Sequence, residues 1–131
     1  MSVNFEPSTP LEAYKAIIDQ LVEEVTPGIS ERLVREDGIY SKAVDQAAEN
    51  EFVRSLTADQ RTILAQMLHE ERRGTVFDVL SRLTWWLCCR DVGLTFKGQP
   101  MPPELSGEGL HGDYIGRCDG WEWPKEGGSA T

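Results

Sequence analysis

Hydrophobic residues recur at spacings of three and four along most of the first 93 residues, which predicts amphipathic helices. The first helix is expected to begin at a capping box, Thr9-Pro10-Leu11-Glu12, in which the Thr9 hydroxyl accepts a hydrogen bond from the Glu12 backbone. Its apolar face extends to Val25, and Thr26-Pro27-Gly28 ends it because proline disfavours a helical residue before it. A shorter helix is predicted over Glu31–Asp37 and closed by Gly38.

The middle of the chain predicts further helices with clear start signals. Ser41 is expected to cap a third helix that runs to about Ser55. A second capping box, with Thr57 as cap and Gln60 reaching back, starts a fourth helix. Gly74 marks either the end of that helix or a kink in it, and helix propensity does not decide between them. The stretch from Thr75 to about Arg90 is apolar nearly all round, which is typical of a central helix or of one covered by a partner chain.

The pattern changes after Gly93, because residues 91–131 hold 9 of the 12 glycines and 4 of the 7 prolines. Leu94–Gly98 favours a short strand before a turn, so one short β-hairpin is possible in an otherwise irregular segment. The sequence therefore predicts a mainly α fold: a single-domain bundle of four or five helices over residues 1–131. Within it we expect a flexible N-terminus (1–8), a helical body (9–93), a segment wrapped across the last helix (94–124) and a frayed tail (125–131).

Length and charge narrow the function classes. A chain of 131 residues fits one domain, and its net charge of −9 argues against nucleic acid and against anionic membrane surfaces. The acids are concentrated on the flanks: residues 1–60 carry 12 acids and 5 bases, and residues 91–131 carry 7 and 3, whereas residues 61–90 carry 3 and 5. No stretch approaches the roughly 20 apolar residues that span a bilayer, and the N-terminus lacks signal-peptide features. A cytoplasmic protein is expected.

Motifs that would identify an enzyme are incomplete. His69-Glu70 begins a zinc-protease pattern, but Arg73 follows instead of the second histidine, so His69 and its charged neighbours are expected at a solvated helix end. The three cysteines, Cys88, Cys89 and Cys118, rule out a complete disulfide framework by their odd number and are expected as one or two buried thiols. We therefore predict no catalytic residue, no metal ligand and no cofactor.

The densest polar and aromatic cluster lies near the C-terminus and leaves two alternatives open. In the first, it lines a ligand site, with His111 and Asp113 as a metal-binding or acid–base pair. In the second, the segment folds over the helices, its tryptophans pack against Trp85 or Trp86, and Arg117 pairs with Asp113 or Asp119. The candidate ligand-binding residues are His111, Asp113, Tyr114, Arg117, Trp121 and Trp123.

Several stretches between Thr57 and Pro124 resemble a family of small, uncharacterised bacterial proteins: Thr57-Ala-Asp-Gln-Arg61, Met67-Leu-His-Glu-Glu-Arg72, Phe77-Asp-Val-Leu80 and Gly120-Trp-Glu-Trp-Pro124. The resemblance implies a bacterial, cytoplasmic source and brings no activity, cofactor or catalytic residue.

The favoured hypothesis for function is an interaction or regulatory protein without catalytic activity. It would form a homodimer through Trp85 and Trp86 or bind a protein partner, for example as an acidic inhibitor of a basic toxin. The alternative is a small-molecule- or metal-binding protein or enzyme, with its pocket between the helices and residues 111–123.

Overall fold

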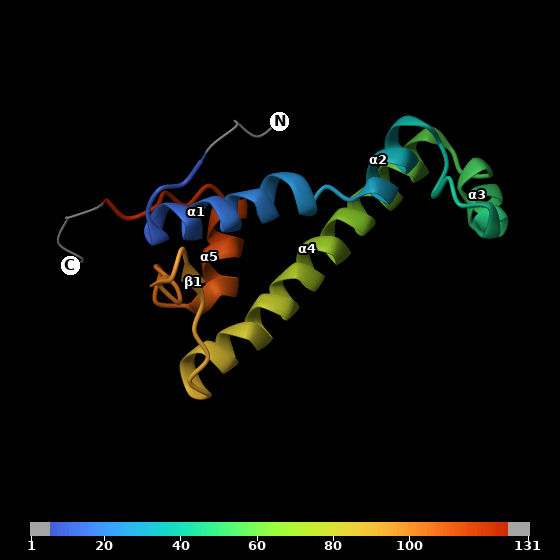
Figure 1. Ribbon diagram of the computed structural model, residues 1–131. Coiled ribbons are helices and arrows are strands. Elements are labelled where there is room, and N and C mark those ends of the chain that lie inside the picture. The colour runs from blue at the N-terminus through green and yellow to red at the C-terminus, as the bar shows by residue number, and fades with distance from the viewer. Residues whose placement is uncertain (1–5, 126–131) are drawn as a thin grey trace. The chain divides into compact units, whose positions relative to one another are not determined.

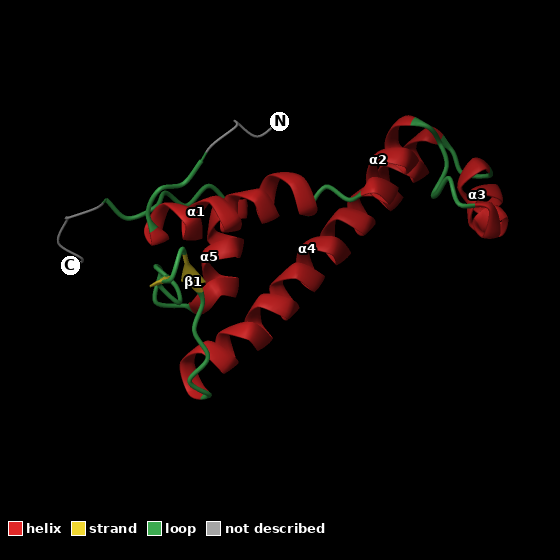
Figure 2. Cartoon of the chain, viewed as in Figure 1, coloured by secondary structure: helices red, strands yellow, loops and turns green. Residues whose placement is uncertain are grey.

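The computed structural model describes residues 6–125 and divides the chain into two compact units. Unit 1 combines the residues up to Glu24 with those from Thr75 onward, and unit 2 comprises Val25–Gly74. Most of the described residues are helical and the strands form a short hairpin, so the predicted mainly α class and the hairpin are confirmed (Figure 2). The predicted single domain stays a prediction. The flexible ends expected at 1–8 and 125–131 fall largely on residues 1–5 and 126–131, which lie outside the described residues.

Unit 1 begins with α1 (Pro10–Gln20), which continues as a π-helix, η1 (Leu21–Val25). The predicted capping box is present: Thr9 Oγ1 accepts from the Glu12 N–H at 3.1 Å. The Glu12 carboxylate in turn accepts from the backbone N–H of Ser8 at 2.9 Å, and this hydrogen bond lowers the pKa of Glu12. The first interaction satisfies a donor that a helix N-terminus leaves without an intrahelical partner, and the second holds Ser8, the residue before the N-cap, against the first turn.

The core of unit 1 forms where α1 meets α5 (Gly109–Cys118) and the second half of α4 (Ala58–Cys89). Figure 1 shows α5 (orange-red) lying against α1 (blue), with the hairpin beside them. The buried side chains come from all three helices: Tyr14, Ile18, Leu80, Leu110 and Tyr114.

The helix α5 corrects the prediction that the segment after Gly93 is irregular apart from a short hairpin. Its glycines support close packing instead of breaking the helix. Gly109 starts α5 at φ +87°, and a Cβ there would lie 2.8 Å from Cγ2 of Thr84 on α4. A Cβ on Gly116 would lie 3.3 Å from the Trp121 side chain. Glycine at these two positions lets α5 approach its neighbours more closely than any other residue would allow.

The hairpin pairs β1 (Thr95–Phe96) with β2 (Gln99–Pro100) in antiparallel register, Phe96 opposite Gln99. Lys97 and Gly98 form the two-residue turn with φ angles of 51° and 79°. Positive φ at both positions is the signature of a type I′ turn, whose twist matches that of the flanking strands.

Unit 2 contains α2 (Ile29–Glu36), a 3-10 turn η2 (Val44–Gln46), α3 (Ala47–Arg54) and the first part of α4. Its buried core consists of small or β-branched side chains, Val34, Val53 and Ala65. The third helix begins at Ala47 and not near Ser41, as the sequence suggested. The Ser41 hydroxyl caps a local turn by accepting from the Ala43 N–H, while the Asn50 side chain accepts from the Ser41 N–H at 2.9 Å.

The helix α4 runs without interruption from Ala58 to Cys89, so of the two alternatives left open at Gly74 the end of a helix is wrong. The predicted cap is present, since Thr57 Oγ1 accepts from the Gln60 N–H at 3.1 Å and the Gln60 side chain accepts from the Thr57 N–H at 2.8 Å. A Cβ on Gly74 would meet no packing neighbour within 4 Å. This glycine therefore does not end the helix, and a glycine in an exposed helix interior costs only about 1 kcal/mol relative to alanine.

Candidate functional site

Asp113 is the centre of a buried polar network in unit 1. Its carboxylate is 0% exposed and accepts from the Tyr14 hydroxyl on α1. It also accepts from the backbone N–H groups of Leu105 at 2.7 Å and Ser106 at 2.9 Å. Burial raises the pKa of Tyr14, and the hydrogen bond to Asp113 raises it further, so this hydroxyl stays a donor. The network joins α1, α5 and the loop before α5 through a single side chain.

Arg117 lies one turn further along α5 and pairs with Asp19 of α1. The guanidinium donates from Nε to Asp19 Oδ1 at 2.7 Å and from Nη2 to Oδ2 at 3.2 Å. It also donates to the Trp121 carbonyl at 2.6 Å and lies 4.9 Å from the centre of the Trp123 ring. The predicted pairing of Arg117 with Asp113 or Asp119 is therefore corrected. Asp113 already accepts from three donors, and the α1 carboxylate matches the guanidinium fork in two places.

His111 contacts a different helix. Its ring packs edge-on against Phe77 of α4 with centroids 5.1 Å apart, and its Nδ1 lies 3.3 Å from the Thr84 hydroxyl. That hydroxyl also donates to the Leu80 carbonyl at 2.8 Å. Residues two apart on a helix point about 200° apart, so His111 and Asp113 face different neighbours. The suggested metal or acid–base pair assumed an extended loop, and the helix α5 separates its two members.

The remaining members of the predicted cluster pack inside unit 1, against α1, α5 or one another. Tyr114 is fully buried in the core of unit 1. Trp123 meets Tyr14 edge-on at 6.0 Å and donates from Nε1 to Asp19 at 3.1 Å. Trp121 packs edge-on against Trp123 at 5.2 Å. The tryptophans were expected against Trp85 or Trp86, and the contact with Tyr14 replaces that expectation.

Two residues of this cluster were missed from the sequence, Tyr14 and Asp19, both on α1. Tyr14 was assigned only to the apolar face of its helix. A buried tyrosine hydroxyl needs a hydrogen-bond partner, and that requirement was the available signal for a polar group packed against α1. Asp19 carried no such signal, because an aspartate beside an apolar face is ordinary on a surface helix. The predicted ligand-binding role of residues 111–123 stays a prediction, with each polar member held by internal contacts.

The end of α4 presents an exposed aromatic pair. Trp85 and Trp86 are 43% and 44% exposed, and their rings contact each other edge-on at 5.3 Å. The Arg90 guanidinium lies 5.4 Å and 5.7 Å from the two ring centres. Cys88 and Cys89 beside them are exposed thiols. Of the one or two buried thiols expected among the three cysteines, only Cys118 is partly buried, against the core of unit 1.

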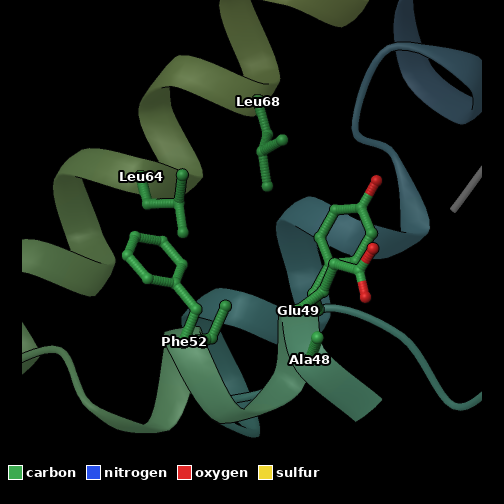
Figure 3. Close-up of a pocket in the computed structure, with 7 residues that line it drawn as sticks. Ala48, Glu49, Phe52, Leu64 and Leu68 are labelled. Carbon is green, nitrogen blue, oxygen red and sulfur yellow. The ribbon is translucent and has the colours of Figure 1, made fainter. Parts of the chain in front are cut away.

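Unit 2 carries an apolar groove between α3 and α4 that the sequence did not indicate. Its volume is about 410 Å³, and one carboxylate, that of Glu49, stands among apolar and aromatic side chains. Figure 3 shows Leu64 and Leu68 projecting from α4 toward Phe52 and Ala48 of α3. The full lining, called the α3/α4 groove from here on, is Tyr40, Ala48, Glu49, Phe52, Val53, Leu64 and Leu68.

His69 holds α2 to α4 within unit 2. Its Nδ1 lies 3.0 Å from Oε1 of Glu31, and Arg72 donates to the Val25 carbonyl at 2.8 Å. The solvated helix end predicted here is corrected, since α4 continues beyond Gly74. Over residues 6–125 there is no group of three or more His, Cys, Asp or Glu side chains placed to hold a metal ion. Within the same residues, no helix has both the length and the apolar character needed to cross a membrane.

The fold and these surfaces define a small, mainly helical protein in which the densest polar cluster joins helices and the apolar features remain open. Comparison with known proteins identifies its family. A family profile matches residues 7–125, and the chain belongs to this family of unknown function, DUF6547. No curated protein and no solved structure matches the chain significantly. The resemblance to an uncharacterised family, expected from the sequence, is confirmed.

Proposed function

We propose that this protein is an interaction protein of the bacterial cytoplasm, without catalytic activity, that forms a homodimer through the exposed face of α4 in unit 1. The observation that carries the proposal is the exposure of Trp85 and Trp86, 43% and 44%. Tryptophan and arginine dominate the binding energy of protein interfaces, and Arg90 stacks beside both rings. A half-exposed tryptophan pair is a large apolar area that a second copy would remove from water.

The spacing of the exposed residues supports a helix–helix contact. Exposed positions follow one another at intervals of four, three, four and three residues: Thr75, Val79, Arg82, Trp86 and Cys89. Such a seam keeps its side chains on one face of a helix, as in the a and d positions of coiled coils. We call it the α4 seam.

The α4 seam is complementary to itself when two copies run antiparallel about Thr84. Val79 of one copy then lies opposite Cys89 of the other, and Arg82 lies opposite Trp86. In an antiparallel pair centred on Thr84, the numbers of two opposite residues add up to 168. On the flank, Asp78 lies opposite Arg90 of the second copy. A two-fold interface requires this kind of self-complementarity, and cation–π and ion-pair contacts both fit it.

Sedimentation equilibrium of the full chain tests the proposal. Wild type is expected to dimerise, and Trp86→Ala to weaken dimerisation at least about tenfold by removing a central aromatic side chain. Ile17→Ala is the matched control, since Ile17 is 47% exposed and lies on α1 of the same unit. A strict monomer at high concentration, or an equal effect of the control, would contradict the proposal.

A charge exchange tests the antiparallel register separately. Asp78→Arg alone and Arg90→Asp alone should each weaken the dimer, because each places like charges opposite one another. The double variant should recover part of the loss, as a double-mutant cycle measures. Additive losses would mean that the two residues do not face each other.

A further inference from the structure

The α3/α4 groove is a second exposed apolar surface. All the residues that line it belong to unit 2, and none of them is part of the α4 seam. Phe52 lines it and is 59% exposed, whereas its neighbour Val53 is 2% exposed in the core of the unit. Adjacent side chains of α3 thus line the groove at different depths: Val53 is part of the buried core, and Phe52 is largely exposed.

Two further exposed apolar side chains of α4 are next in sequence to residues that line the groove. Leu64 and Leu68 line the groove, and Ile63 and Met67 immediately beside them are both 61% exposed. Several large exposed apolar side chains on one helix beside an apolar groove are typical of a site for another molecule. Methionine is common on such surfaces because its flexible side chain adapts to the molecule that binds.

The segment of unit 2 that contains α3 carries more acids than bases, and one of these acids lines the groove. Asp45, Glu49 and Glu51 are all exposed, and Glu49 lines the groove itself. Over residues 40–60 there are four acids, the fourth being Asp59, and two bases, a balance of −2. A partner with positive charge next to its apolar residues complements this surface.

We propose that the α3/α4 groove binds an amphipathic helix of another protein, with apolar side chains in the groove and basic residues against Glu49 and its neighbours. Two helices frame the groove, as in the recognition mode in which a helix lies in a hydrophobic groove and inserts side chains at i, i+3, i+4 and i+7. A volume of about 410 Å³ accommodates such a row of side chains. The groove is open to solvent, so a small apolar molecule would keep more of its surface wet than ligand pockets normally permit.

Fluorescence anisotropy with labelled synthetic peptides and the full chain tests this inference. The probe is a helical peptide of about 18 residues with leucine at i, i+3, i+4 and i+7 and lysine on the opposite face. One control peptide carries glutamate in place of lysine, and another has the same composition in scrambled order. The lysine peptide should bind at least about tenfold more tightly than either control, and the difference from the glutamate peptide should shrink at high salt.

Three variants locate the binding site. Phe52→Ala should weaken binding of the lysine peptide about tenfold, because it removes the most exposed aromatic side chain of the groove. Glu49→Lys should reverse the preference between lysine and glutamate peptides. Ile29→Ala is the matched control, since Ile29 is also exposed in unit 2 but lines a different hollow, and it should leave binding unchanged. Circular dichroism confirms that each variant keeps its helices.

Other occupants would give different results, each of which overturns the inference. Equal binding of the scrambled peptide, or no effect of Phe52→Ala, would mean that the groove does not recognise an amphipathic helix. If Phe52→Ala converts a dimer into a monomer in sedimentation, the occupant is a second copy of this chain. If an apolar dye binds in a Phe52-dependent manner while all three peptides fail, the groove is a small-molecule site.

Discussion

The two units bury different kinds of chemical group. Unit 1 encloses the Asp113 carboxylate with three hydrogen-bond donors, from Tyr14 and two backbone N–H groups. Unit 2 has a small apolar core around Val34 and leaves Phe52 of α3 largely exposed. A buried carboxylate is tolerated only when its hydrogen bonds are made, so the geometry of unit 1 is tightly specified. Unit 2 leaves apolar area exposed at its groove, as unit 1 does at Trp85 and Trp86, and exposed apolar area is the property expected of a binding surface.

The largest expected effect comes from removing the carboxylate of unit 1. Asp113→Ala leaves the Tyr14 hydroxyl and the N–H groups of Leu105 and Ser106 without their acceptor. We expect the free energy of unfolding to fall by about 4 kcal/mol, since each unsatisfied buried donor costs about 1–3 kcal/mol and water can reach some of them. Urea denaturation followed by circular dichroism measures the loss.

Glu122→Ala is the control for this experiment, because Glu122 is an exposed acid in the same unit. It should change the free energy of unfolding by less than about 0.5 kcal/mol. Similar effects of the two substitutions would show that the buried network does not distinguish unit 1 from unit 2.

A valine pair within unit 2 provides the next largest effect. Val34 is fully buried and Val44 is 96% exposed, so the same change to alanine creates a cavity at one position only. Val34→Ala should cost about 2 kcal/mol and Val44→Ala almost nothing. Hydrogen exchange should show Val34→Ala lowering protection mainly over residues 25–74. An equal loss of protection in both units would mean that they unfold as one cooperative body.

The smallest effect concerns alkaline pH in unit 1. The raised pKa of Tyr14 means that the folded state favours the neutral hydroxyl, so this stabilisation is complete below the unfolded pKa of about 10. It is lost as pH rises above that value. The Tyr14→Phe variant has no hydroxyl to ionise at this position. The difference in free energy of unfolding between wild type and Tyr14→Phe should therefore narrow by about 1 kcal/mol between pH 10 and 11. A gap independent of pH in urea titrations would argue against burial of this hydroxyl.

Local signals in the sequence predicted much of the fold. The caps at Thr9 and Thr57 act over three residues, and both are present in the structure. The hairpin turn at Lys97-Gly98 is equally local. The start of α3 was misplaced because the Ser41 hydroxyl accepts from Ala43 in a turn, an arrangement that competes with helix capping for the same side chain.

The candidate site was less predictable, because its partners are far apart in sequence. Asp19 and Arg117 are 98 residues apart, and Tyr14 and Asp113 are 99 apart. Glycines were interpreted as helix breakers, although Gly109 and Gly116 allow α5 to pack closely against its neighbours. Because α5 was expected to be irregular, His111 and Asp113 were placed together when a helix separates them. The α3/α4 groove depends on tertiary packing of α3 on α4, which no local pattern encodes.

The discontinuity of unit 1 has a consequence for the order of folding. Unit 2 is one continuous stretch, Val25–Gly74, so all the residues of its internal contacts are present once that stretch has been made. The hydrogen bond between Tyr14 and Asp113 instead requires closure of a loop of 99 residues, an entropic cost that must be met before the bond contributes. During synthesis α1 is made long before α5, so the apolar face of α1 stays uncovered until α5 has been made. We expect the assembly of unit 1 to be the slow step of folding. We also expect the chain to be most prone to aggregation before that step is complete.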